Sequence, residues 1–445
     1  MSQMLPESRR SPEEIVVKES GHKGSVPAGV APGYFNLAAL TSLFLIWGFI
    51  TGLNDVLVPH LKNVFELSYT RAVLVQFCFF AAYFLVSVPA GLLLHRVGYQ
   101  LGLVLGLLVA CAGCLIFIPA ARLQIYGVFL LGLFVLASGI TLLQVSANPY
   151  VIALGGARSA PSRLNLTQAF NSLGTTLAPV IGGAVFFTAI SVGSDPDTAA
   201  NIAEFRAREA ALVETPYFWL AVILLLMVAF FSWIRLPVTP NHLKAPGRGV
   251  LEKDVFSIWR FPRLTLGAVG IFAYVGAEVA IGSFLVSFFG EPSVARMRPF
   301  EAAHFVSLYW GGAMIGRFVG ALLLRYVSAG KMLAVCSLGS VALIAVAMHS
   351  SGAIAVWSIV AVGLCNSIMF PTIFSLALRG LGGHTCQGSG VLCMAIVGGA
   401  IIPLLQGLVA DNAGIQVSFL VPLLCYCFIV YYGAFSPDLR GDAEE

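Results

Sequence analysis

Two carboxylates, Asp55 and Glu278, stand inside stretches of sequence that are otherwise apolar enough to cross a membrane. Placing an acid near the centre of a bilayer costs about 2.5–3.5 kcal/mol on insertion scales. Acids in such segments therefore face a polar cavity and mark binding sites or ion pathways. Because one acid lies in each half of the chain, the pair indicates ion-coupled transport.

The composition is that of a protein with many membrane spans. Of its 445 residues, 58% are hydrophobic and 10% are charged, whereas about a quarter of the residues in a soluble domain are charged. The nine cysteines fall mostly in apolar runs, so we expect buried thiols and neither a disulfide framework nor a metal site. We expect no cofactor and no nucleic-acid partner. Residues 1–33 are polar and lack the apolar core of a signal peptide.

The hydropathy pattern predicts an all-α membrane protein with twelve transmembrane helices, since about 20 apolar residues span a bilayer. The predicted spans are roughly 34–59, 70–94, 100–120, 125–154, 164–192, 216–236, 263–290, 301–324, 331–349, 353–378, 387–410 and 415–436. With the N-terminus placed inside, most of the 25 Lys and Arg residues fall on the inner side. This asymmetry predicts that both termini are cytoplasmic.

The chain divides into two similar halves at its longest interior polar stretch. We expect a polar tail (1–33), a six-helix bundle (34–236), a central cytoplasmic loop (237–262), a second six-helix bundle (263–436) and a short tail (437–445). The second half repeats features of the first: a Gly-Leu-rich run ends at Arg96 after span two and at Arg325 after span eight, and Pro149 is matched by Pro371. A parallel repeat of six helices is typical of the major facilitator fold, with the substrate between the halves.

Polar stripes on the first half indicate what that substrate is. Trp47, Thr51, Asn54 and Asp55 recur at spacings that place them on one face of span one. Span four carries Thr141, Gln144 and Asn148, and span five carries Asn165, Gln168, Asn171, Ser172 and Thr175. An aromatic face can stack on a sugar ring while amides and acids bind its hydroxyls. The alternative for any single amide is a structural role, in which it forms a hydrogen bond between neighbouring helices.

The second half would supply the opposite wall of the cavity. Tyr274 and Glu278 lie one turn apart in span seven, as do Asn366 and Phe370 in span ten. We interpret Glu278 as a substrate or ion ligand. The alternative is an ion pair with Arg317, which lies deep in span eight. For Arg317, and for Arg96 and Arg325, we favour a structural or gating role.

Four sequence runs resemble the fucose–galactose–glucose:proton symporter family of the major facilitator superfamily. They are Phe44-Leu-Ile-Trp47-Gly-Phe-Ile-Thr-Gly-Leu-Asn54-Asp55, Gln144-Val-Ser-Ala-Asn148-Pro149, Arg163-Leu-Asn165-Leu-Thr-Gln168-Ala-Phe-Asn171-Ser and Phe370-Pro371-Thr-Ile-Phe-Ser-Leu. The resemblance implies cation-coupled uptake of a monosaccharide. It also implies that Asp55 is the proton carrier, that Gln168 and Asn171 line the sugar site, and that Trp47 lies beside it.

The chain departs from the fucose permease at three positions and there resembles the glucose/galactose branch. Gln144 replaces a glutamate, Glu278 replaces a glutamine, and Phe370 replaces a tyrosine. Our hypothesis is that Glu278 takes over the part of the acid missing from span four. The substrate-binding set is then Trp47, Asn54, Gln144, Asn148, Gln168, Asn171, Glu278, Asn366 and Phe370.

We therefore predict a monomeric, plasma-membrane symporter that imports a neutral hexose such as glucose or galactose, coupled to protons through Asp55 and Glu278. Sodium is an alternative coupling ion, and an amino sugar such as N-acetylglucosamine is an alternative substrate. A non-transporting sensor would need a large cytoplasmic domain. An enzyme would need a metal cluster or a nucleophile–base pair, and the scattered histidines offer neither.

Overall fold

The computed structural model describes residues 32–64, 69–123, 125–190, 199–234, 236 and 261–435. Side chains are described for 35–53, 75–123, 125–181, 214–234, 236 and 261–435. The predicted N-terminal tail up to residue 31, the predicted C-terminal tail, residues 237–260 of the central loop, and the side chains of Asn54 and Asp55 lie outside this part. All regular secondary structure in the described part is helical.

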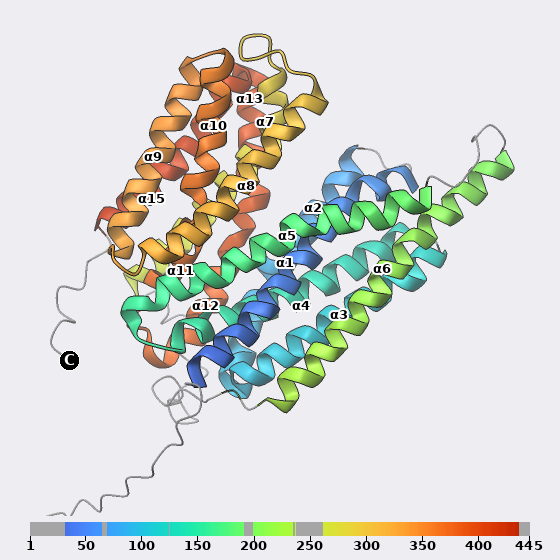
Figure 1. The fold of residues 1–445 in the computed structure, drawn as a ribbon, viewed down its shortest axis with the longest axis horizontal. Helices are drawn as coiled ribbons and strands as arrows, with labels where there is room; N and C mark the ends of the chain where they lie inside the picture. The colour runs from blue at the N-terminus through green and yellow to red at the C-terminus, as the bar shows by residue number, and fades with distance from the viewer. Residues whose placement is uncertain are drawn as a thin grey trace, which may run out of the picture.

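The first half of the chain forms one group of helices (Figure 1). Its elements are α1 (Pro32–Val64), α2 (Tyr69–Val97), α3 (Tyr99–Leu123), α4 (Tyr126–Ala153), η1 (Ala157–Ser159), α5 (Ala160–Ile190) and α6 (Ala199–Trp233). Helix α1 packs along α5, while α4 packs against α2 and α3, and α6 covers α3.

The second half forms a second group, inclined to the first (Figure 1). Its elements are α7 (Pro262–Gly290), α8 (Pro299–Leu323), α9 (Ala329–His349), α10 (Gly352–Asn366), α11 (Met369–Ala377), η3 (Gly382–His384), α12 (Thr385–Met394), η4 (Ala395–Val397), α13 (Gly398–Ala413), α14 (Ile415–Ser418) and α15 (Leu420–Phe435). Across the described residues, eleven helical segments are long and apolar enough to cross a membrane. Helix α5, the fifth predicted span, is outside that set.

The last three predicted spans are not single helices, which corrects the sequence-based expectation. The tenth is broken between Asn366 and Met369, the eleventh passes through the 3-10 turn η4 before α13 begins, and the twelfth is interrupted at Phe419, between α14 and α15. Pro371 has no amide hydrogen to donate to the carbonyl of Ser367, four residues earlier, so one helical hydrogen bond is missing at the first break. The break leaves the Ser367 carbonyl available to a side chain.

Helices α1 and α5 approach so closely that only glycine fits at two positions of their contact. A Cβ atom on Gly48 would lie 1.9 Å from the carbonyl oxygen of Asn171, and one on Gly174 would lie 2.0 Å from that of Leu45. At this separation Asn171 donates from its side chain to the carbonyl of Phe44 at 3.1 Å. The two glycines thus place the polar stripes of α1 and α5 side by side.

The Gly48→Ala substitution should lower the thermal unfolding temperature of the purified protein, because the added methyl group meets backbone that cannot move aside. Overpacking of this kind costs about 1–3 kcal/mol. Gly311→Ala is the matched control, since a Cβ there meets nothing within 4 Å and alanine is otherwise the better helix former. Equal unfolding temperatures for the two variants would show that the α1–α5 contact is not as tight as described.

Candidate functional site

A cavity of about 170 Å³ lies between the two halves and is open to solvent. Its lining comes from α1, α2, α4 and α5 on one side and from α7, α8, α11 and η4 on the other. The lining residues are Trp47, Thr51, Tyr83, Gln144, Gln168, Asn171, Tyr274, Val275, Glu278, Arg317, Phe370, Pro371 and Ile396. The lining combines aromatic rings, side-chain amides and one pair of opposite charges.

The wall from the first half is built of hydrogen-bonded amides and aromatic rings. The hydroxyl of Tyr83 donates a hydrogen bond to Oε1 of Gln144 at 2.9 Å. This bond fixes the orientation of the uncharged Gln144 amide. Trp47 is 6% exposed, and its ring lies 5.2 Å from that of Phe44. The indole is therefore held in place by packing, and it forms part of the cavity lining.

The wall from the second half carries Glu278, whose carboxylate lies 3.5 Å from the guanidinium of Arg317. The two side chains are only 12% and 14% exposed, respectively. Below Glu278, the hydroxyl of Tyr309 contacts the Glu278 carbonyl at 3.5 Å and accepts a hydrogen bond from Asn366 at 2.8 Å. Phe370 faces Tyr274 with a ring separation of 6.5 Å.

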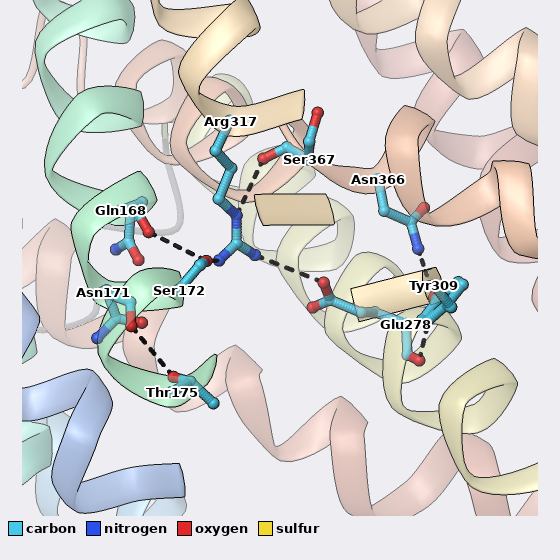
Figure 2. Close-up of polar contacts among 9 residues, drawn as sticks. All are labelled: Gln168, Asn171, Ser172, Thr175, Glu278, Tyr309, Arg317, Asn366 and Ser367. Atoms are coloured by element: carbon cyan, nitrogen blue, oxygen red, sulfur yellow. Dashed lines mark hydrogen bonds and ion pairs between the residues drawn. The ribbon is translucent and has the colours of Figure 1, made fainter. Parts of the chain in front are cut away.

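Arg317, which is part of the cavity lining, joins the two halves through polar contacts (Figure 2). Besides pairing with Glu278, it donates to the hydroxyl of Ser172 on α5 and, through Nε, to the carbonyl of Ser367 at 3.3 Å. Ser367 is the residue whose carbonyl is freed by Pro371. The guanidinium of Arg317 therefore replaces the missing helix hydrogen bond to Ser367. Its other nitrogens contact Glu278, in the same half, and Ser172, in the other half.

Pro149, the matching proline of the first half, also leaves a helix carbonyl free to accept a hydrogen bond from the other half. Pro149 cannot donate to the carbonyl of Val145, four residues earlier in α4. That carbonyl instead accepts a hydrogen bond from the hydroxyl of Ser389 on α12, at 2.8 Å. Both prolines of the sequence repeat thus expose a carbonyl that a side chain from another helix satisfies.

One end of the cavity is closed by direct contacts between the halves. The Ser162 hydroxyl donates to the carbonyl of Ala321 at 2.5 Å, and the Asn165 amide donates to the carbonyl of Arg317 at 2.7 Å. On the other side of the interface a Cβ on Gly390 would lie 2.6 Å from the carbonyl of Ser87. Among the described residues, these contacts separate the cavity from this end of the molecule.

The structure brings together most of the predicted site residues that it describes. Trp47, Gln144, Gln168, Asn171, Glu278, Arg317 and Phe370 all line the cavity. The ion pair that we set against ligand binding by Glu278 is present. Asn148 and Asn366 are fully buried and outside the lining, Arg325 lines a different cavity, and Arg96 lines neither. Tyr83 was missed by the sequence analysis, because an isolated tyrosine in an apolar run carries no spacing signal.

The Major Facilitator Superfamily model matches residues 38–392. The chain belongs to this superfamily. It is 52% identical to the glucose/galactose transporter of Brucella abortus over 90% of this chain and 93% of that one. It is 44% identical to the putative glucose/galactose transporter of Helicobacter pylori over 92% of this chain and 97% of that one. Among solved structures, that of the E. coli fucose:proton symporter superposes with a TM-score of 0.84 at 30% identity, covering 91% of this chain and 99% of that one.

A double-mutant cycle tests the pairing of Glu278 with Arg317. Arg317→Gln alone leaves a buried carboxylate without its cation, and breaking a buried pair on one side costs about 3–5 kcal/mol. Glu278→Gln added to it removes the unpaired charge, so the double variant should regain most of the lost stability. The measurement is thermal or denaturant unfolding of the purified protein in detergent. Additive losses in the double variant would show that the two side chains do not interact.

Proposed function

We propose that this chain is a proton-coupled symporter that imports a neutral hexose, such as glucose or galactose, by alternating access. The observation that carries this proposal is the cavity between the halves, where Trp47 and Phe370 accompany the amides of Gln144, Gln168 and Asn171. Aromatic faces cover the apolar face of a pyranose, and amides offer donors and acceptors to its hydroxyls. The names of the relatives agree with this substrate class and, for the fucose symporter, with proton coupling.

Glu278 and Asp55 are our proposed coupling groups. Asp55 follows Thr51, a cavity-lining residue, by one turn of α1. A proton arriving from the open end neutralises Glu278 and removes the negative partner of Arg317. The guanidinium is then held by the Ser172 hydroxyl and the Ser367 carbonyl alone, which weakens its hold on the closed end. The proton leaves Glu278 toward the other side once the halves have rocked, and the ion pair reforms.

The direction of transport follows from the proposed orientation. We propose that both termini and the closed end face the cytoplasm, because an excess of Lys and Arg is typical of cytoplasmic loops. The open end then faces outward, where substrate and proton enter. We further propose that the protein acts as a monomer in the bacterial inner membrane, without cofactor and without covalent chemistry on the sugar. Each coupled charge gains about 2.3 kcal/mol from a potential of 100 mV.

Uptake of radiolabelled glucose and galactose into proteoliposomes tests the symport proposal. An inward proton gradient should drive accumulation, and about fifty-fold is the limit for one charge at 100 mV. Asp55→Asn and Glu278→Gln should abolish accumulation but keep sugar exchange at equilibrium, since they remove the proton sites and leave the cavity. Asp411→Asn, at an exposed aspartate, is the matched control and should behave as wild type.

The possible results separate the parts of the proposal. Accumulation driven by sodium alone would show that the coupling ion is not a proton. A Glu278→Gln variant that accumulates sugar normally would remove Glu278 from the coupling mechanism. Absence of glucose and galactose uptake by the wild type would overturn the substrate class, and N-acetylglucosamine would be the next sugar to measure.

Tyr83→Phe should raise the KM for hexose with little change in the maximal rate. The substitution keeps the ring and removes only the hydroxyl that orients Gln144. Loss of one hydrogen bond that positions a ligand-binding amide is worth about 0.5–1.5 kcal/mol, or roughly two- to tenfold in affinity. Tyr431→Phe, at an exposed tyrosine outside the cavity, is the control. An unchanged KM in Tyr83→Phe would exclude Gln144 from the sugar site.

A further inference from the structure

A second cavity, of about 1000 Å³, lies between the halves beyond the closed end of the first. The first half contributes the loop after α4 and the 3-10 turn η1, residues 155–158. The second half contributes residues 324–330, between α8 and α9, and the turn after α11. The cavity therefore exists only while the two halves are together at this end.

Arginines from both halves surround this cavity. They are Arg158 from the first half, and Arg263, Arg325 and Arg379 from the second. No carboxylate of the described residues is part of the lining. The excess of basic residues at the cytoplasmic ends of membrane helices explains why arginines lie at this end, but it does not require arginines of both halves to meet around one hollow.

The loop that carries Arg158 is held in a fixed shape by Arg163. Its guanidinium donates to the carbonyl of Val151 at 3.2 Å, that of Ile152 at 2.7 Å and that of Gly156 at 3.2 Å, and also to the Ser159 hydroxyl. These bonds cap the C-terminal end of α4 and fasten the turn that follows. The backbone at Arg158 is therefore held in one conformation by these hydrogen bonds.

The N-terminus of α9 also lies at this cavity. Ala329 and Gly330, the first two residues of the helix, line it. The side chain of Ser328 makes no capping hydrogen bond to the first turn of α9. The N-terminus of a long helix offers free amide hydrogens and the positive end of the helix dipole to an anion. Together with the arginines, this is the set of groups that binds a phosphate.

We propose that this cavity binds a phosphomonoester dianion and that the bound anion holds the two halves together at the closed end. Separation of the halves would carry Arg158 away from the other three arginines. A ligand that bridges them therefore binds the closed-end state more tightly and shifts the population toward it. In the proposed orientation, which rests on the proposed function, the anion acts from the cytoplasm and slows sugar entry.

Two sources could supply this chemistry. A soluble sugar phosphate is one, and the reaction class that would produce it is phosphoryl transfer to the imported hexose. The headgroup of an anionic phospholipid is the other. Both would be recognised by the same arginines, so the experiment must separate them.

Binding is tested first, without transport. Thermal unfolding of the purified wild type is measured in detergent against increasing inorganic phosphate, with sodium chloride at matched ionic strength as reference. We expect stabilisation specific to phosphate, with an apparent affinity about tenfold weaker in Arg158→Gln, because charged hydrogen bonds are lost. Arg325→Gln is a second variant in case the first does not fold. Arg296→Gln, at an exposed arginine outside the cavity, should match wild type. Equal responses of wild type and both cavity variants, or none at all, would overturn the proposal.

Transport then identifies the source. Uptake of hexose is measured in proteoliposomes of neutral lipid loaded with glucose 6-phosphate or with chloride, and in liposomes containing phosphatidate. Inhibition by internal glucose 6-phosphate that Arg158→Gln relieves supports a soluble ligand. Inhibition by phosphatidate alone, again relieved in the variant, supports a lipid headgroup. Loss of hexose uptake under every condition would contradict the proposed function, while the unfolding measurement would still decide whether the anion site exists.

Discussion

The guanidinium of Arg317 is the group on which the centre of this molecule depends. It is nearly buried, and it is satisfied by three partners: the carboxylate of Glu278, the hydroxyl of Ser172 and the carbonyl of Ser367. A charge at this depth is stable only with such partners. Because Ser172 belongs to the other half of the chain, satisfying the charge also joins the halves. Protonation of Glu278 would leave Arg317 with two uncharged partners, one of which belongs to the other half.

The backbone contacts around Arg317 depend on prolines and glycines. Pro371 breaks the tenth span and thereby frees the carbonyl that Arg317 uses, while Pro149 frees the carbonyl that receives Ser389. Glycine permits a close crossing between the halves at Gly390, which lies against α2. Few interlocking side chains need to be pulled apart at such crossings. This suits an interface that must open and close during each transport cycle.

Much of the architecture could be predicted from the sequence, because span length and the internal repeat each have a direct physical cause. Helical spacing was also enough to gather Trp47, Gln168 and Asn171 on one cavity, since it decides which side chains share a face. It does not decide how far each helix is rotated about its axis. Asn148, one turn beyond Gln144, consequently lies inside the bundle of its own half.

Other features depended on contacts between distant segments. The break after Asn366 turns this residue toward Tyr309 and away from the cavity, and hydropathy alone gives no sign of that break. The bond from Tyr83 to Gln144 joins residues 61 apart in the chain. The partners of Arg317 likewise come from three different helices or helix ends, so its role as a bridge became visible only in the assembled fold.

Distance measurement across the closed end tests the alternating-access mechanism most directly. Spin labels at Ala157 and Val327, exposed residues of opposite halves, would be introduced into a variant without native cysteines and studied by double electron–electron resonance. We predict a single short distance at high pH without sugar, and a second, longer distance when protons and hexose are both present. In Glu278→Gln the pH response of the distances should be smaller than in the wild type, since Asp55 is then the one proposed proton site that is left. A distance distribution that does not respond to sugar or protons, or a pH response as large in Glu278→Gln as in the wild type, would contradict coupling through the Glu278–Arg317 pair.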